Sequence, residues 1–137
     1  MHALRGISLQ INKGEFIAVV GASGSGKSTM MHLIGCLDVP SKGEIYLKSR
    51  DIAQLSESSL ASLRGKTIGF IFQQFNLIPT LTALENVGLP MLFQNTSAQE
   101  RKQKASLLLT KFGLGNRTDH KPTELSGGQS QRVAIAR

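Results

Sequence analysis

Residues 21–28 carry the pattern best suited to chemistry, because Gly-Ala-Ser-Gly-Ser-Gly-Lys-Ser matches G-x-x-x-x-G-K-[ST] at every position. Glycines at this spacing let the backbone turn its N–H groups inward, and the start of a following helix adds partial positive charge. Lys27 supplies a full charge for the β- and γ-phosphates, and the Ser28 hydroxyl is the hard oxygen donor that Mg²⁺ prefers. The motif predicts binding of a nucleoside triphosphate; the alternative is a glycine-rich turn without a ligand. We assign phosphate binding to Gly21, Ser23, Gly24, Ser25, Gly26, Lys27, Ser28 and Thr29.

Two further motifs could meet the same ligand. Residues 125–129, Leu-Ser-Gly-Gly-Gln, combine a serine N-cap with two glycines that leave the backbone of a helix start bare. Taken alone, Ser-x-x-Gln is equally a simple capping box. Gln73 ends an apolar segment, where its amide could reach a metal ion or its bound water; taken alone, it is an ordinary polar strand end.

The elements that must position these motifs follow from hydrophobic pattern and capping residues. We expect strands at 8–11, 16–20, 44–47 and 67–72, the second of them buried on both faces. A helix should follow the phosphate loop, with one face made by Met30, Leu33, Ile34 and Leu37. A short helix is expected at 56–64, and capping signatures at 82–85, 97–100 and 126–129 each predict a further helix start. Gly113 should end the second of these, and the last should run to Arg137.

Composition excludes several classes of protein. The 137 residues are 40% hydrophobic and 18% charged, which is typical of a globular domain and not of a disordered chain, coiled coil or collagen. The net charge of +7 favours anionic partners. Cys36, the one cysteine, is expected to pack as a small hydrophobe. No apolar run approaches the roughly 18 residues of a membrane span.

Taken in order, the phosphate loop, the segment 72–74 and the segment 125–132 resemble the nucleotide-binding domain of an ABC transporter. Residues 35–38, 75–79 and 81–87 are similar to the macrolide-export and lipoprotein-releasing branch. The resemblance implies an α/β fold of the P-loop NTPase type. Residues 1–73 would form a nucleotide-binding core with strands around the phosphate loop. Residues 74–137 would form a helical subdomain, and the domain would be incomplete.

The same resemblance implies that two such domains sandwich two ATP molecules with Mg²⁺. The phosphate loop of one copy would face Ser126, Gly127, Gly128 and Gln129 of the other. Lys27 and Gln73 would be catalytic, and Ser28 and Gln73 would hold the metal. The complete protein would hydrolyse ATP to drive export or lipoprotein release. It would lie peripherally on the cytoplasmic face of the inner membrane, meet a permease subunit near residues 75–84, and need no nucleic acid.

The sequence departs from that family at three places. No apolar strand ending in Asp-Glu follows residues 125–129, and Asp38 stands on the wrong element to replace it. The histidines, His2, His32 and His120, are misplaced for the family's switch histidine, and the aromatic residue that stacks on adenine is missing. We therefore expect a fragment whose own hydrolysis is weak or absent. The alternatives are a DNA-acting ATPase head, for which the expected long heptad region is missing, and a remnant that only binds nucleotide.

Overall fold

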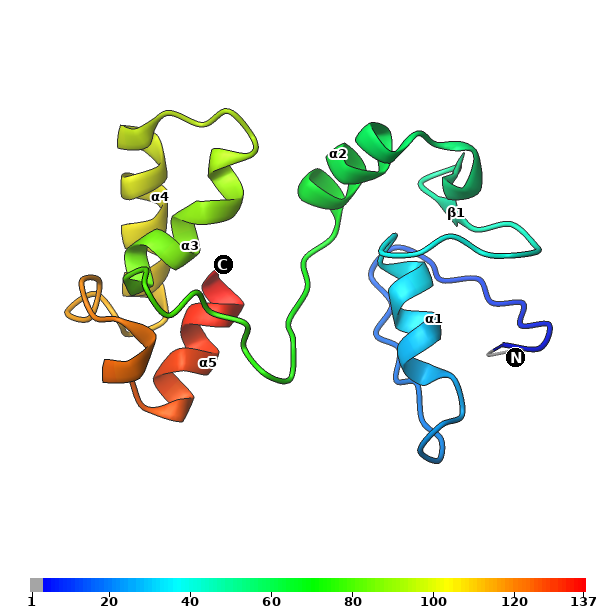
Figure 1. Ribbon diagram of the computed structural model, residues 1–137, viewed down its shortest axis with the longest axis horizontal. Coiled ribbons are helices and arrows are strands. Elements are labelled where there is room, and N and C mark those ends of the chain that lie inside the picture. Colours follow the sequence, from blue (N-terminus) through cyan, green and yellow to red (C-terminus); the bar gives the residue numbers. More distant parts are fainter. Residues whose placement is uncertain (1–3) are drawn as a thin grey trace. The chain divides into compact units, whose positions relative to one another are not determined.

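The computed structural model describes residues 4–137, and the chain divides into two units, Met1–Ile68 and Gly69–Arg137 (Figure 1). This division precedes by a few residues the one predicted from the sequence, which placed Gln73 in the first part. The first unit contains the phosphate loop, and the second contains residues 125–129. His2 lies outside the described residues.

The first unit is built from two helices and a small hairpin. Its elements are α1 (Lys27–Ile34), β1 (Tyr46–Leu47), β2 (Arg50–Asp51), the 3₁₀ turn η1 (Ile52–Gln54) and α2 (Glu57–Thr67). β1 and β2 pair antiparallel with Tyr46 opposite Asp51. Lys48 and Ser49 connect them with φ values of 50° and 64°, the left-handed conformation that a tight hairpin turn requires. α2 contains the predicted helix at 56–64 and begins where the Ser56 hydroxyl accepts a hydrogen bond from the Ser59 N–H.

Cys36, Ile52 and Leu60 form the buried core of this unit. Cys36 is 1% exposed, which confirms that it packs as a hydrophobe. The Arg64 guanidinium on α2 donates to the Cys36 carbonyl at 2.6 Å and so ties α2 to the loop that follows α1. The core is small, because three buried side chains and their partly buried neighbours supply all of it.

The predicted strands at 8–11, 16–20 and 67–72 are wrong, because none of these segments is paired as a strand. Of the segment 44–47, only Tyr46–Leu47 is paired. Phe16 is 97% exposed and Val20 87% exposed, although the sequence placed them in a doubly buried strand. A strand exists only when a neighbour accepts and donates its backbone hydrogen bonds, and within residues 4–137 no segment does so for 16–20.

The helix after the phosphate loop is shorter than predicted. α1 ends at Ile34 with Gly35 as C-cap, and Cys36 follows with a φ of 54°. Leu37, expected on the helix face, therefore lies beyond the helix and is 45% exposed. Met30, Leu33 and Ile34 remain partly buried on one side of α1, as the pattern predicted.

The second unit is helical, and its helices begin where the capping residues predict. Its elements are α3 (Ala83–Leu92), α4 (Ala98–Lys111), the 3₁₀ turn η2 (Pro122–Glu124) and α5 (Gly127–Ala136). Thr82 caps α3 in a complete capping box, and the Ser97 hydroxyl accepts from the Glu100 N–H at the start of α4. Gly113, with a φ of 72°, follows the end of α4. Figure 1 shows α3, α4 and α5 side by side around a core whose buried members are Ala83, Val87, Ala105, Leu109, Leu114, Val133 and Ala136.

Candidate functional site

The phosphate loop adopts a backbone that only its glycines accept readily. Gly21, Gly24 and Gly26 have φ values of 157°, 78° and 93°, so all three lie on the positive side where L side chains are strained. A Cβ atom at Gly21 would also lie 2.8 Å from the Ser25 Oγ. The spacing of glycines in the sequence is therefore the spacing of left-handed turns in the loop.

Lys27 folds its side chain back over this loop. Its Nζ donates to the carbonyl oxygen of Gly21 at 2.9 Å and to that of Ala22 at 2.6 Å. The Ser25 N–H also donates to the Ala22 carbonyl, at 3.3 Å. A single positive charge is thus held at the rim of the loop, beside the start of α1.

The start of α1 offers unpaired N–H groups. Gly26 is its N-cap and provides no side-chain hydrogen bond. Within residues 4–137, the N–H groups of Lys27, Ser28 and Thr29 have no hydrogen-bond partner. Unpaired N–H groups and the helix dipole together favour an anion at this place.

The residues present fit a magnesium ion bound mainly through phosphate oxygens. Ser28 is exposed in the first turn of α1, so its hydroxyl can serve as one oxygen ligand. No group of three or more His, Cys, Asp or Glu side chains gathers as a metal site in the part of the chain that the structure describes. Gln73, the other expected ligand, is exposed in the second unit, whereas Ser28 belongs to the first.

The start of α5 is a second exposed helix N-terminus. The Ser126 Oγ accepts from the Gln129 N–H at 3.3 Å, and the Gln129 Oε1 accepts from the Ser126 N–H at 2.8 Å. Gln129 is therefore a capping residue here, as the capping-box interpretation predicts. Gly127 and Gly128 are exposed, and their N–H groups find no acceptor in residues 4–137. The two glycines thus leave two donors free at the beginning of α5.

His32 and His120 take no part in the hydrogen bonds described above. His32 is exposed on α1, as predicted. His120 lies in the loop before η2, where its Nε2 is 2.8 Å from the Arg117 guanidinium. Its carbonyl oxygen accepts from the Ala83 N–H at 2.8 Å and so helps to fix the start of α3. The contacts of His120 therefore indicate a structural role.

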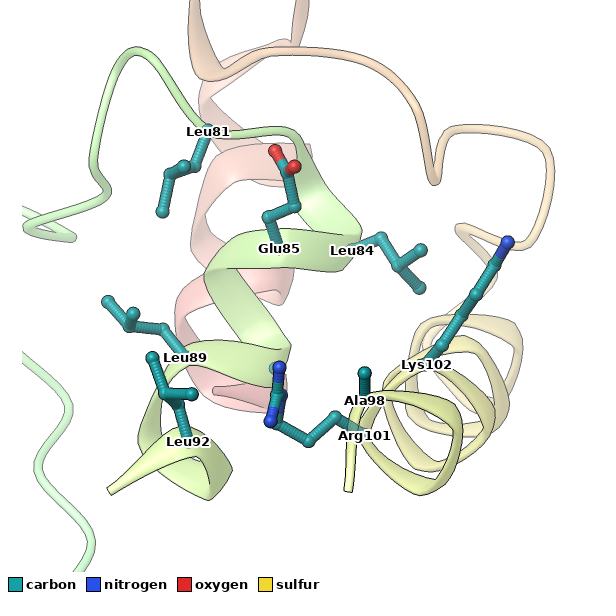
Figure 2. Close-up of a pocket in the computed structure, with 9 residues that line it drawn as sticks. Leu81, Leu84, Glu85, Leu89, Leu92, Ala98, Arg101 and Lys102 are labelled. Carbon is teal, nitrogen blue, oxygen red and sulfur yellow. The ribbon is translucent and has the colours of Figure 1, made fainter. Parts of the chain in front are cut away.

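A groove that no sequence motif indicated lies between α3 and α4, with a volume of about 420 Å³ (Figure 2). Leucine side chains from α3 and from Leu81, which precedes it, make its apolar wall. Glu85 on α3 carries a negative charge at the groove, and Arg101 and Lys102 on α4 carry positive charges. The complete lining is Leu81, Leu84, Glu85, Gly88, Leu89, Leu92, Ala98, Arg101 and Lys102.

Asn86 and Arg137, which were not among the predicted site residues, hydrogen-bond to the backbone of the second unit. Asn86 is fully buried on α3 and hydrogen-bonded to the segment before that helix. The sequence does indicate Asn86, because it is an uncharged polar residue in the mostly apolar helix α3. Arg137 bonds residues about sixty positions earlier, and no sequence pattern indicates such a pairing.

The structure has the features typical of a nucleotide-binding cassette. These are a loop of left-handed glycines that leads into a helix, a lysine over that loop and a second glycine-rich helix start. The chain belongs to the ABC transporter family, whose sequence pattern matches residues 4–137. This confirms the resemblance stated from the motifs. No helix of the described residues combines the length and apolar character needed to cross a membrane.

Individual ABC transporter proteins are similar to the chain over nearly its whole length. The chain is 50% identical, over all 137 residues, to an uncharacterized ABC transporter ATP-binding protein of Thermotoga maritima and covers 58% of that protein. It is 53% identical to the macrolide export ATP-binding/permease protein MacB of Brucella melitensis, of which it covers 21%. It is 52% identical to the pyoverdine export ATP-binding/permease protein PvdT of Pseudomonas putida, again covering 21%. The chain thus spans about three fifths of the first relative and one fifth of the others.

A solved structure confirms the fold class. The chain superposes with a TM-score of 0.87 on the ATP-binding cassette MJ0796, described as dimeric and bound to ADP and Pi after hydrolysis. The two are 50% identical, and the match covers 98% of this chain and 60% of that one.

Proposed function

We propose that this chain is the ATP-binding part of an export transporter, which binds ATP with Mg²⁺ and, in the complete protein, hydrolyses it to drive transport. The observation that carries the proposal is the phosphate loop, with its left-handed glycines and three unpaired N–H groups at the start of α1. The names of the relatives favour export of small molecules, because MacB and PvdT are named for macrolide and pyoverdine export. None of the relatives reported above is named for an action on DNA.

The residues of the loop would each contribute in a different way. The N–H groups of Lys27, Ser28 and Thr29 would bind phosphate oxygens, and the Lys27 ammonium would neutralise charge on the β- and γ-phosphates. The Ser28 hydroxyl would hold Mg²⁺, which supplies charge neutralisation for phosphoryl transfer when bound. Gln73 would orient the attacking water.

A second copy of the cassette would complete each nucleotide site. One chain has two helix starts with free N–H groups, at α1 and at α5. In a head-to-tail pair, each nucleotide would meet the phosphate loop of one copy and Ser126, Gly127 and Gly128 of the other. The structures of the relative MJ0796, which are described as dimeric, support pairing of two copies.

The groove between α3 and α4 suits a membrane-embedded permease domain as the other partner. Its leucines offer an apolar surface, and its opposite charges on α3 and α4 can orient a short helix. The relatives named ATP-binding/permease proteins combine both functions by name. We therefore place the protein peripherally on the cytoplasmic face of the inner membrane, where ATP is available.

Substitution of Lys27 tests nucleotide binding. In the full-length protein, Lys27→Ala removes the charge beside the loop and should weaken ATP binding by about a hundredfold, as expected for loss of a charge-assisted contact worth about 3 kcal/mol. Lys42→Ala, at an exposed lysine of the same unit, is the control and should leave the affinity unchanged. Calorimetry with ATP and Mg²⁺ measures both, and equal affinities would contradict the assigned role.

Substitution of Ser126 tests the sandwich. Ser126→Arg places a bulky cation at the start of α5, so it should leave ATP binding by one copy intact and block ATP-driven pairing. Analytical ultracentrifugation with ATP distinguishes the two states. Normal pairing of the variant would refute the sandwich. Salt-sensitive DNA binding, without stimulation of hydrolysis by the permease, would instead favour the DNA-acting alternative.

A further inference from the structure

The segment 75–82, which follows Gln73 and Gln74 and leads into α3, is fastened to α3 by Asn86. The Asn86 Oδ1 accepts from the Ile78 N–H at 2.8 Å. Its Nδ2 donates to the carbonyl oxygens of Ile78, Leu81 and Thr82 at 3.1, 3.1 and 3.0 Å. Because Asn86 is fully buried, these bonds are shielded from water, and residues 78–82 are held as one piece with α3.

The other end of this segment is fastened to α5 by Arg137. The Arg137 Nη1 donates to the Asn76 carbonyl at 2.6 Å, and Nη2 donates to the Phe75 carbonyl at 3.1 Å. Phe75 and Asn76 have φ values of 32° and 48°. Burial lowers the pKa of the Arg137 guanidinium from its usual value, yet an arginine stays charged throughout the physiological range. The planar fork of a guanidinium presents its donors to two adjacent carbonyls in a fixed geometry, whereas a lysine ammonium is a compact charge on a flexible stem without that geometry.

One helix thus connects two parts of the expected nucleotide site. Ser126 is the N-cap of α5, and Arg137, which follows Ala136 of this helix, binds the backbone two residues after Gln73. Val133 and Ala136 anchor α5 in the core, and the Arg137 bonds add an attachment to the segment that follows Gln73. Their direct effect is on the position of the segment that follows Gln73.

We propose that Arg137 is a positioning residue that couples the start of α5 to the segment after Gln73, so that Gln73 and Ser126 shift together when nucleotide binds. The proposal rests on the proposed function. Leu81 belongs to the same segment and also lines the groove between α3 and α4.

Hydrogen exchange of the full-length protein tests this coupling. In the wild type, ATP-driven pairing at Ser126 should slow exchange of the backbone amides of residues 75–78. In Arg137→Ala, ATP affinity should be unchanged, whereas the slowing should fall by about fivefold or more, the lower end of ordinary allosteric couplings. Arg137→Lys, which retains the charge but not the fixed two-donor geometry, should lie between the two. Lys111→Ala removes a cation from an exposed position on α4 and should behave as the wild type.

Each result decides one question. An Arg137→Ala protein that binds ATP and pairs, and whose residues 75–78 are protected as in the wild type, overturns the role of Arg137 alone. A wild type that neither binds ATP nor pairs overturns the proposed function and this proposal with it. Should Arg137→Ala fail to fold, Arg137→Lys carries the same comparison, and full protection in that variant overturns the need for the two-carbonyl fork.

Discussion

At the scale of single residues, the glycines of the phosphate loop give a clean test of backbone conformation. Gly24 has a φ of 78°, and a Cβ atom placed there would have nothing within 4 Å. Gly24→Ala therefore changes conformational preference without a steric clash. The left-handed conformation costs an alanine about 1–2 kcal/mol, which should depopulate the binding-competent loop conformation and so lower the apparent ATP affinity by about 5–30-fold.

Gly69→Ala is the matched control for Gly24→Ala. Gly69 also has open space around its Cβ position, but its φ is not positive. Its ATP affinity should equal that of the wild type in the same calorimetric titration. Equal affinity of both variants would show that the loop does not need this conformation to bind ATP.

Cys36 tests the small core of the first unit. Burial raises the pKa of its thiol, and the positive charge of Arg64 opposes this more weakly. A raised pKa leaves less thiolate at any pH near neutrality, and the thiolate is the reactive form. Iodoacetamide should therefore label Cys36 about tenfold or more slowly in the folded protein than in urea. Equal rates would mean that Cys36, Ile52 and Leu60 do not form a closed core.

At the scale of elements, Asn86 joins a helix to the segment before it. Asn86→Ala leaves the Ile78 N–H and the Leu81 carbonyl without their partner, whereas the Ile78 and Thr82 carbonyls keep a backbone donor. Each unsatisfied buried group costs about 1–3 kcal/mol. The free energy of unfolding of the second unit should fall by at least that amount, so its denaturant midpoint should be lower. Asn116→Ala, at an exposed asparagine in a turn, should change the midpoint little. A similar shift for both variants would contradict the role of Asn86.

Helices were more predictable from the sequence than strands for a physical reason. A helix start depends on neighbours in sequence, so Thr82 with Glu85 and Ser126 with Gln129 were sufficient to place α3 and α5. A strand depends on a partner that can lie anywhere in the chain, so the apolar run at 16–20 could not reveal that no described segment pairs with it. The same reasoning explains the site: the phosphate loop is local and was predicted, whereas the bond from Arg137 to Phe75 spans most of the second unit.

At the scale of the whole molecule, the two units have separate cores. Ile52 is fully buried in the first unit, and Leu109 is fully buried in the second. No residue belongs to both clusters among the described residues. The 137-residue chain should therefore unfold in two steps, because each core can be lost without the other.

Paired core substitutions test this separation. Ile52→Ala and Leu109→Ala each remove a fully buried side chain and should destabilise their own unit by about 2–5 kcal/mol. Ile52→Ala should lower only the transition of the first unit, and Leu109→Ala only that of the second. Calorimetry resolves the two transitions. A single transition lowered by both variants would show that the units fold cooperatively.

The hydrogen bonds of the Lys27 ammonium affect how a polyphosphate can enter the loop. An ammonium group has three hydrogens to donate, and the Gly21 and Ala22 carbonyls take two of them. The third has no acceptor among residues 4–137. An arriving phosphate oxygen can take that hydrogen first and the other two one after the other, so the lysine exchanges its acceptors stepwise and is never stripped of all of them.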